Sequence, residues 1–384
     1  MSNVLYVITS LSVGGAQKAL LNLVTSNISQ EYKPFVLALR QVDGIQAQFA
    51  QADIPIHELQ LNKLSGLLRA PIQVWRLVRA INPTIIHGWM HHGNLLAVLA
   101  WLFSGRKSML LWGMHHTPEA ATAERLQHAL VLRLGQWLSH YPDNILYVSQ
   151  RSQQRHREMG YANERALVIA NGIAVCAEAV EGLRAEVRAE LGIDANIPVI
   201  GSLTRYVPEK DIPNLVEAIR LFGRVDKQAC FVLAGEGMSL DNLELVALLE
   251  QAGCQASVRL LGVRKDASRL IAVMDIATLS SRREAFPLFL AEAMAAGVPC
   301  VATDVGDIAE SVGTTGLIVP RESPQQLADA WQQLLAMTTE ERRQRGQMAQ
   351  TRMRDIYSLD TVIKRYQVIF QSKVAAMAIP SHKS

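Results

Sequence analysis

Two carboxylates stand in the otherwise apolar stretch EAFPLFLAEAMAAG, at Glu284 and Glu292. Pro287 is typical of a first helical turn and Gly297 of a helix end, so the pattern predicts a helix over 287–296. Glu284 then precedes the helix, whereas Glu292 lies inside it. Acids that only balance a helix dipole are the alternative, but they belong in the first turn, and neither residue is there.

The start of this predicted helix can bind an anion. Its free backbone N–H groups, those of Phe286, Leu288 and Phe289 on either side of Pro287, lie next to the carboxylate of Glu284. Apolar neighbours surround Glu292, where a buried acid needs hydrogen-bond partners. A pair of ribose hydroxyls would provide them. The segment can therefore hold a phosphate and a ribose.

Two cations follow a predicted strand in the stretch GSLTRYVPEKDIPNL, at Arg205 and Lys210. A proline-containing loop separates them, and a helix follows. Positive charges at the carboxyl end of a strand suit a diphosphate, because they can neutralise its charge as it leaves. The alternative is an ordinary solvated basic loop.

The first predicted strand leads into a pair of glycines, Gly14 and Gly15, at the start of a helix. Glycines there let a ligand approach the backbone and the helix amides. The stretch is not a GxGxxG motif, and no acid ends the second predicted strand, which argues against a dinucleotide-dependent oxidoreductase. A plain tight turn is the alternative.

Histidines gather in two further segments, IIHGWMHHGN and LLWGMHHTPEA, which are read as strand ends. No Asp or Glu lies at ligand spacing and no HxxxH helix occurs, so a metal cluster is disfavoured. A polar, aromatic-lined sugar pocket fits better, with one histidine contacting the reacting group. The histidines are His87, His91, His92, His115 and His116.

Strands alternate with helices of ten or more residues in both halves of the chain, which predicts two doubly wound α/β domains with parallel sheets. The predicted domains are 1–172 and 173–360, divided at an Asn-Gly turn. A final helix in 361–384 has no strand after it and is expected to pack back on the first domain, with a frayed tail. Two such domains facing each other would form a cleft lined by strand ends.

The chain has 384 residues and a net charge of +3 that is unevenly divided. Residues 1–170 carry 15 Lys and Arg against 9 Asp and Glu, and the remainder carries 23 against 26. A basic first half suggests an anionic partner, although solvated surface charge is the alternative. Aromatic–basic interleaving is absent, which disfavours nucleic acid.

Several features predict a cytoplasmic protein. No signal peptide is read at the start, and the four cysteines have no CxxC spacing. The apolar run Leu95–Phe103 is half the length that spans a bilayer.

Taken together, these motifs resemble the glycosyltransferase family 4 (group 1) enzymes, which have the GT-B fold. The resemblance covers nearly the whole chain. The E-x7-E pair within EAFPLFLAEAMAAGVPCVATDVG and the R-x4-K pair carry most of it, supported by GGAQ, ANGI and LAGEG.

The resemblance implies sugar transfer from a nucleotide-sugar donor with retention of the anomeric configuration and no cofactor or metal. By analogy, Arg205 and Lys210 contact the donor diphosphate, Glu292 the ribose and Glu284 the sugar hydroxyls. The backbone at 286–288 would contact sugar and phosphate. Family frequency favours UDP as the nucleotide.

On the first domain, the resemblance implies that Gly15 lines the site and that His115 is the active-site histidine, with His116 as the alternative. His87, His91 and His116 are candidates for the acceptor side. The predicted acceptor is a lipid-linked glycan, because the basic charge, the arginines of the 69–79 helix and the apolar run 95–103 favour the inner membrane surface. This implies bacterial polysaccharide or lipopolysaccharide assembly.

Three positions depart from the family pattern. Ala285 and Asp211 stand where glycine is usual, and Ala174 replaces the acid of an NGID linker. Two other functions stay open on the same fold. They are a nucleotide-sugar 2-epimerase and a protein that binds nucleotide sugars without catalysis.

Overall fold

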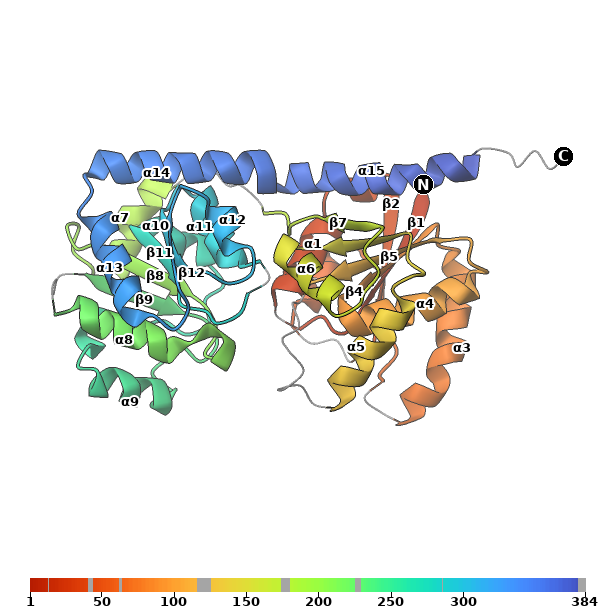
Figure 1. The fold of residues 1–384 in the computed structure, drawn as a ribbon, viewed down its shortest axis with the longest axis horizontal. Coiled ribbons are helices and arrows are strands. Elements are labelled where there is room, and N and C mark those ends of the chain that lie inside the picture. The colour runs from red at the N-terminus through yellow and green to blue at the C-terminus, as the bar shows by residue number, and fades with distance from the viewer. Residues whose placement is uncertain are drawn as a thin grey trace. The chain divides into compact units, whose positions relative to one another are not determined.

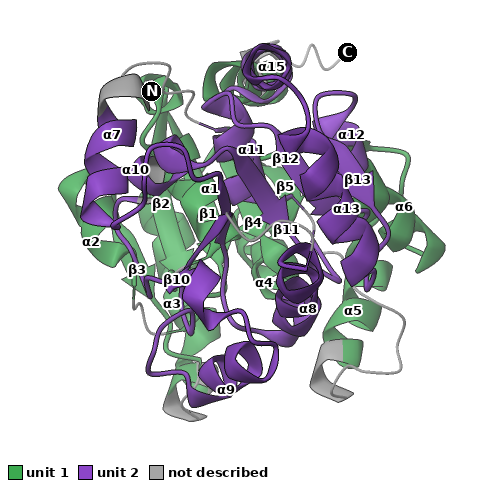
Figure 2. Ribbon diagram, turned by 90° about the vertical axis from the view of Figure 1, so that its left-hand side faces the viewer, with its two compact units in different colours: residues 1–172, 359–384 green, residues 173–358 purple. Residues whose placement is uncertain are grey.

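The computed structural model describes residues 1–12, 14–40, 44–61, 64–115, 126–173, 180–224, 229–284 and 286–378. The chain forms two compact units (Figure 2). Unit 1 comprises Met1–Gly172 and Leu359–Ser384, and unit 2 comprises Ile173–Ser358. The sequence predicts divisions after 172 and after 360, and the compact units divide after 172 and after 358.

Unit 1 is built on a seven-stranded sheet with the order β3-β2-β1-β4-β5-β6-β7, in which all neighbours are parallel (Figure 1). The reversal of strand order between β1 and β4 makes it doubly wound. Its strands are β1 (Ser2–Ile8), β2 (Tyr32–Ala38), β3 (Ile56–Glu58), β4 (Ile85–Trp89), β5 (Met109–Met114), β6 (Asn144–Tyr147) and β7 (Ala166–Val168).

Helices cover both faces of this sheet. They are α1 (Gly15–Val24), α2 (Gln46–Gln51), α3 (Leu64–Ile81), α4 (Met90–Phe103), α5 (Leu126–Leu138), α6 (Gln150–Glu158) and α15 (Leu359–Ala378), with a 3-10 turn at Asn27–Gln30. Helices α3, α4 and α5 lie side by side, with α4 in the middle (Figure 1).

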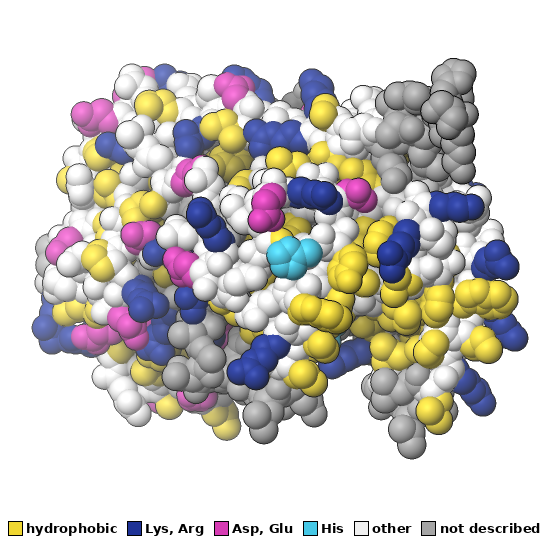
Figure 3. Space-filling model, turned by 45° about the vertical axis from the view of Figure 1, so that its right-hand side comes forward, with side chains coloured by type: hydrophobic (Ala, Val, Ile, Leu, Met, Phe, Trp, Pro, Cys, Tyr) yellow, Lys and Arg dark blue, Asp and Glu magenta, His cyan; other side chains and the backbone are white. Residues whose placement is uncertain are grey.

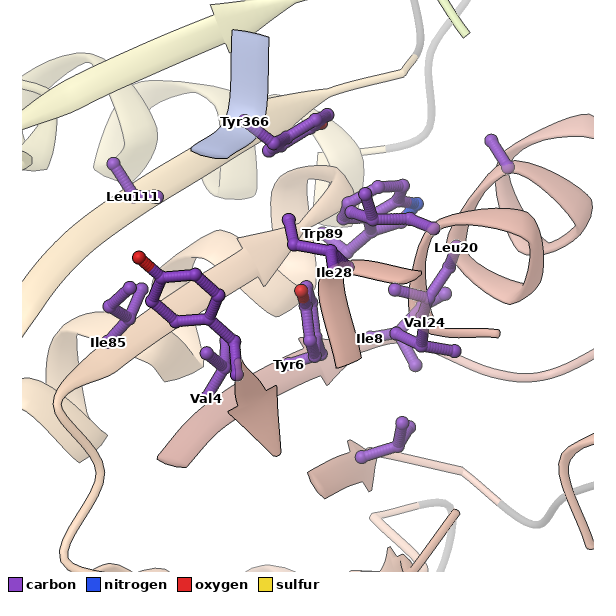
Figure 4. Close-up of a cluster of buried hydrophobic side chains, with 14 of the residues drawn as sticks. Val4, Tyr6, Ile8, Leu20, Val24, Ile28, Ile85, Trp89, Leu111 and Tyr366 are labelled. Atoms are coloured by element: carbon purple, nitrogen blue, oxygen red, sulfur yellow. The ribbon is translucent and has the colours of Figure 1, made fainter. Parts of the chain in front are cut away.

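The alternation of side chains along β1 divides the core of unit 1 into two clusters. Val4, Tyr6 and Ile8 belong to a cluster that includes side chains of α1 and α15. Figure 4 shows Leu20 and Val24 of α1 and Tyr366 of α15 in this cluster. Leu5 and Val7 face the opposite cluster, to which α3 and α4 contribute. Because both faces of β1 are covered, its run of apolar residues is continuous rather than alternating.

Unit 2 has a six-stranded sheet with the order β10-β9-β8-β11-β12-β13, again parallel throughout. Its strands are β8 (Val199–Leu203), β9 (Cys230–Ala234), β10 (Val258–Leu260), β11 (Ile276–Leu279), β12 (Cys300–Thr303) and β13 (Leu317–Val319). The prediction of two doubly wound α/β halves is confirmed.

The helices of unit 2 lie before, between and after its strands. They are α7 (Val180–Glu190), α8 (Ile212–Phe222), α9 (Leu243–Gln251), α10 (Ala267–Val273), α11 (Leu288–Ala295), α12 (Ile308–Val312), α13 (Pro324–Leu335) and α14 (Thr339–Arg352). Short 3-10 turns occur at Pro208–Lys210 and Gln255–Ser257, and a π turn at Met353–Tyr357 leads into α15.

The chain passes between the two units twice, near residues 172–173 and 358–359, and these two segments contact each other. Ile173 pairs with Ser358 in an isolated parallel bridge, and its N–H donates to the carbonyl of Tyr357 at 3.1 Å. A Cβ at Gly172 would lie 3.0 Å from the Cα of Leu359. Glycine in the ANGI motif is therefore required by the close passage of the α15 start.

Candidate functional site

The charged residues of unit 2 gather where its strand order reverses. Strands β8 and β11 are neighbours, but the chain leaves them toward opposite edges of the sheet. Ligands of open α/β sheets bind at the carboxyl ends of such strands. The loop after β8 carries Arg205 and Lys210, and the loop after β11 carries Glu284. We call these the cation loop (204–211) and the acid loop (280–284).

The structure pairs Lys210 with Glu284. The ammonium group of Lys210 forms an ion pair with Oε1 of Glu284, which also accepts a hydrogen bond from Oγ of Ser281 at 2.8 Å. The side chains of Lys210 and Glu284 are 19% and 9% exposed. A cation and an acid that lie 74 positions apart in sequence thus meet in a largely enclosed place, where a charge pair is stronger than in water.

Backbone contacts hold the two loops together. The hydroxyl of Ser280 donates to the carbonyl oxygens of Lys210 at 2.9 Å and Asp211 at 3.2 Å. The N–H of Arg282 donates to the carbonyl of Glu209 at 2.8 Å. The end of the cation loop is therefore fixed against the acid loop by main-chain geometry as well as by charge.

Arg205 lies at the start of the cation loop and is exposed, with no ion pair or side-chain hydrogen bond to any residue the structure describes. Its loop is anchored to the LAGEG segment, because the N–H of Tyr206 donates to the carbonyl of Glu236 at 2.8 Å. A Cβ at Gly235 would lie 2.0 Å from the carbonyl oxygen of Thr204, so this close approach requires glycine. The motif supports the loop that presents Arg205.

Helix α11 begins one residue after the predicted start, with Pro287 as its N-cap. No side chain caps it, so the first amides, from Leu288 onward, are available to an anion. The ring of Phe286 is buried and packs on Tyr357 at 5.4 Å. Ala285 lies outside the described residues.

The structure corrects one expectation for Glu292. Its neighbours predict a buried acid, but the residue is only half-buried, while Ala291, Ala293 and Met294 are buried. The side chain therefore keeps access to solvent from inside α11, one helical turn after Leu288. A carboxylate placed in this way can accept hydrogen bonds without the full cost of burial.

The corresponding edge of unit 1 carries aromatic rings and small residues. Strands β1 and β4 are neighbours at its reversal point, and α1 begins at the exposed Gly15 with no side-chain cap. Trp89, the last residue of β4, is buried and donates from its indole nitrogen to the carbonyl of Ala16 at 2.9 Å. Trp89 thus connects the glycine turn with the histidine segments.

His115, directly after β5, stacks on Trp89 with ring centroids 4.0 Å apart and 20° between the planes. A Cβ at Gly113 would lie 3.0 Å from Nε2 of His115, so glycine there leaves room for the ring. Burial lowers the pKa of His115 to about 3, and hydrogen bonding to the side chain of Asn171 partly opposes this shift. The ring is therefore neutral at physiological pH. His116 lies outside the described residues.

The other two histidine candidates are placed differently from what the sequence predicts. His87 lies inside β4 rather than at its end, is completely buried, and has no partner for either ring nitrogen among the described residues. His91 is buried, and its Nε2 lies 3.0 Å from Nε2 of His156, whose Nδ1 bonds to the carbonyl of Ser152. Neither imidazole is exposed to an acceptor here.

The part of the chain that the structure describes contains neither a metal-binding cluster nor a membrane-spanning helix. No group of three or more His, Cys, Asp or Glu side chains is arranged to hold a metal ion. Within the same residues, no helix has both the length and the apolar character needed to cross a bilayer.

The sequence did not single out three residues that the structure brings to these edges. Trp89 was hidden in a strand that reads as core, and Asn171 in a motif that reads as a turn. Ser281 donates a hydrogen bond to the same oxygen of Glu284 that pairs with Lys210, and its sequence signal is its position three residues before Glu284. Tryptophan at the carboxyl end of a central strand is the signal that could have been used.

Comparison with known proteins gives matches in both units. The family model described as "Glycosyltransferase Family 4" matches residues 13–175, and the one described as "Glycosyl transferases group 1" matches residues 196–337. The chain is 28% identical over 188 residues to the N-acetyl-alpha-D-glucosaminyl L-malate synthase of Bacillus anthracis, which is 48% of each protein. The chain thus spans about half the length of this curated relative.

Two further similarities are informative. The lipopolysaccharide core biosynthesis glycosyltransferase LpsE of Rhizobium meliloti is 33% identical over 117 residues, 30% of this chain and 32% of that protein. The crystal structure of Anabaena HepE in complex with UDP-glucose superposes with a TM-score of 0.83 at 21% identity, covering 97% of this chain and all of the other. The fold is that of the GT-B glycosyltransferases, and the chain belongs to the group 1 (family 4) glycosyltransferases.

Proposed function

We propose that this protein is a retaining glycosyltransferase that moves a sugar from a nucleotide-sugar donor, a UDP-sugar, to a glycan acceptor. The observation that carries the proposal is the meeting of Lys210 and Glu284 where the strand order of unit 2 reverses, beside the uncapped start of α11. A donor has a diphosphate for the cations and helix amides and sugar hydroxyls for the acid. HepE, with the same fold, binds UDP-glucose.

The donor-binding roles follow from charge. Arg205 and Lys210 attract the diphosphate, and the amides from Leu288 onward add hydrogen bonds as its charge grows on departure. Glu284 accepts from the sugar hydroxyls, and Glu292 from those of the ribose. Two cations and a helix start can carry out this stabilisation, so we propose that transfer requires no metal or other cofactor. Full activity in excess EDTA would support this, and loss reversed by Mg²⁺ would contradict it.

Retention follows if the acceptor attacks from the side on which the diphosphate leaves. The bond from the anomeric carbon to the phosphate oxygen breaks, the bond to the acceptor oxygen forms, and the departing phosphate takes the acceptor proton. The described residues that directly follow β1, β4 and β5 include no carboxylate to act as a nucleophile, which favours this route. His115, neutral and next to Trp89, can hydrogen-bond to a sugar or acceptor hydroxyl without adding charge.

Calorimetric titration with UDP, ADP, GDP and their sugar derivatives tests the donor class. We expect one nucleoside diphosphate to bind at micromolar concentration, and its sugar derivative to be consumed only when acceptor is present. Free epimerised sugar without acceptor would instead identify a 2-epimerase. Tight binding with neither transfer nor hydrolysis would identify a non-catalytic binding protein. An NMR spectrum of the product decides between retention and inversion.

We further propose that the acceptor is lipid-linked, that it belongs to cell-surface polysaccharide or lipopolysaccharide assembly, and that unit 1 docks on the cytoplasmic membrane surface. The apolar surface is on α3 and α5. Exposed apolar side chains recur there at helical spacing, and Figure 3 shows hydrophobic and basic side chains gathered together. On α3 these are Leu68, Ile72 and Trp75, and on α5 they are Leu130, Leu134 and Trp137.

Basic residues accompany this apolar surface. Exposed arginines on the same helices are Arg69, Arg76, Arg79 and Arg133, and the guanidinium group of Arg79 lies 5.5 Å from the ring centre of Trp75. An apolar surface edged by positive charge fits the interface of an anionic bilayer. The run Leu95–Phe103, which the sequence put forward for this role, lies on α4 between the other two helices, and most of it is buried or half-buried.

Sedimentation with vesicles tests the membrane proposal. We expect binding to vesicles that contain anionic phosphatidylglycerol, weaker binding at high salt, and little binding to neutral phosphatidylcholine. Trp75→Ser with Trp137→Ser should abolish it while nucleotide affinity stays unchanged. Tyr161→Phe, which alters a buried aromatic residue of the same unit, is the control. Wild-type protein that ignores anionic vesicles at low salt would contradict the membrane proposal but leave the donor proposal intact.

A further inference from the structure

Asp211, which ends the cation loop, has an unusual backbone conformation. Its φ of 48° and ψ of 54° place it in the left-handed region, between the 3-10 turn that ends at Lys210 and the first residue of α8. Glycine adopts this region freely, and among other residues Asp and Asn tolerate it best. This conformation explains why the family usually has glycine here and why Asp can take its place in this chain.

Replacing glycine with Asp adds a charge that must be compensated. The side chain of Asp211 is only 2% exposed, and a buried carboxylate is costly unless it is paired. Nε of Arg282 lies 3.0 Å from Oδ2 of Asp211, though its N–H is not aimed at this oxygen, so the attraction is that of an ion pair. Arg282 also lies 3.2 Å from the exposed Glu322.

This ion pair connects the same two loops as the donor-binding residues. Asp211 directly follows Lys210, and Arg282 stands two positions before Glu284. With the hydroxyl of Ser280 on the carbonyl oxygens of Lys210 and Asp211, the pair fixes the turn that directs the lysine side chain. It therefore acts on Lys210 from the residue next to it.

We propose that Asp211 and Arg282 are positioning residues, which hold Lys210 where it meets Glu284 in the free protein and the diphosphate of the bound donor. The inference rests on the proposed function. It adds a pair to which the resemblance assigns no role, because the family has glycine at the first position. Uncompensated, the carboxylate of Asp211 would also repel a diphosphate bound by its neighbour.

Calorimetric titration with UDP, or with the diphosphate that the panel selects, tests the pair. Arg282→Met leaves the carboxylate uncompensated, and we expect about tenfold weaker binding, a higher KM for the donor and a smaller change in kcat. Arg282→Lys keeps the charge and should restore most of the affinity. Glu322→Gln, which removes the exposed partner of the same arginine, is the matched control and should bind UDP as the wild type does.

A second variant separates charge from backbone conformation. Asp211→Gly keeps the left-handed turn without a carboxylate, and combining it with Arg282→Met should recover part of the affinity lost by Arg282→Met alone. If Arg282→Met lowers only the Tm and binds UDP with wild-type Kd, the pair is merely structural and the positioning role is overturned. If the wild type itself binds no nucleoside diphosphate, the proposed function fails, and the positioning role fails with it.

Discussion

The reversal points of the two sheets have the same topology but opposite chemistry. In unit 2, β8 and β11 end in loops that carry Arg205, Lys210 and Glu284, and ion pairs join them. In unit 1, Trp89 ends β4 at the reversal point, and His115 follows the neighbouring strand β5. Their rings stack, and burial keeps the imidazole neutral. The fold alone therefore does not determine the chemistry at a strand end, which depends on the side chains that the strand end carries.

Under the proposed function, this difference gives each unit a task. A diphosphate carries several negative charges, and the cation loop of unit 2 offers it the side chains of Arg205 and Lys210. A hydroxyl acceptor or a sugar ring carries no charge and is recognised by aromatic faces and neutral hydrogen-bonding groups, which unit 1 supplies. Variants in unit 2 should therefore change nucleotide affinity. Variants in unit 1 should change turnover and leave nucleotide affinity unchanged.

The largest effect is expected for Lys210→Ala. The variant loses the cation that, in the proposed mechanism, stabilises the departing diphosphate, and it leaves Glu284 with Ser281 but without its cationic partner. We expect kcat at saturating donor to fall by about 10²–10³-fold. Lys265→Ala, at an exposed position of the same unit, is the control. A near-normal kcat for Lys210→Ala at saturating donor would remove the charge-based role given to unit 2.

The second prediction concerns competition within the ion pair. In the free protein Glu284 neutralises Lys210, so a diphosphate must displace the carboxylate to reach the ammonium group. Glu284→Gln should therefore bind UDP several-fold more tightly, while transfer from the intact donor falls about tenfold or more because a sugar contact weakens. Calorimetry and initial rates measure the two effects. Weaker UDP binding by Glu284→Gln would show that the pair is not a competitor.

The third prediction takes the comparison to unit 1. His115→Phe keeps a ring to stack on Trp89 but removes both ring nitrogens. We expect kcat to fall by about tenfold to a hundredfold and the Kd for UDP to stay within about twofold of the wild type, because UDP lacks the sugar. Trp112→Phe, which alters a buried ring of β5 whose indole nitrogen has no hydrogen-bond partner among the described residues, serves as the control for packing alone. A large loss of UDP affinity in His115→Phe would break the division of tasks between the units.

The fold could be predicted from sequence because its signals are local. Most strands of unit 2 are largely apolar runs with a helix after them. No strand is predicted from the sequence at β3 or β7, the two edge strands of the sheet in unit 1, where none of the three residues is buried and the apolar signal is weak. The charge and position of Arg205 and Lys210 predicted a diphosphate site, whereas the role of Glu284 at the sugar came from the family resemblance. Their contacts could not be predicted, because a pairing across 74 positions depends on strand order.

His87 shows a different limit. The sequence places it near a strand end, but β4 extends through Trp89 and turns the imidazole into the core. Its ring lies near those of Tyr6, Trp89 and Tyr366, the last contributed by α15 at the far end of the sequence. Only the return of α15 to unit 1 shows why this histidine is enclosed.

The smallest effect is a pH dependence of stability in unit 1. Burial, followed by the nearby His115, lowers the pKa of His87 to about 3, whereas an unfolded chain has about 6.5. Between these pH values the unfolded state binds a proton that the folded state does not bind. The contribution of this group to the free energy of unfolding is therefore complete above about pH 6.5 and is lost as the pH falls toward 3. One such group contributes a slope of about 1.4 kcal/mol per pH unit.

His87→Phe tests this dependence, since it removes one group that gains a proton on unfolding but keeps an aromatic ring among aromatic neighbours. Denaturant unfolding between pH 4 and 6 should show a slope of free energy against pH that is smaller by about one proton, even if the larger ring costs some stability at pH 7. His140→Phe, at an exposed position, should keep the wild-type slope. An unchanged slope in His87→Phe would mean that the buried imidazole accepts its proton in the folded state, and that the neutrality assigned to the histidines of unit 1 is wrong.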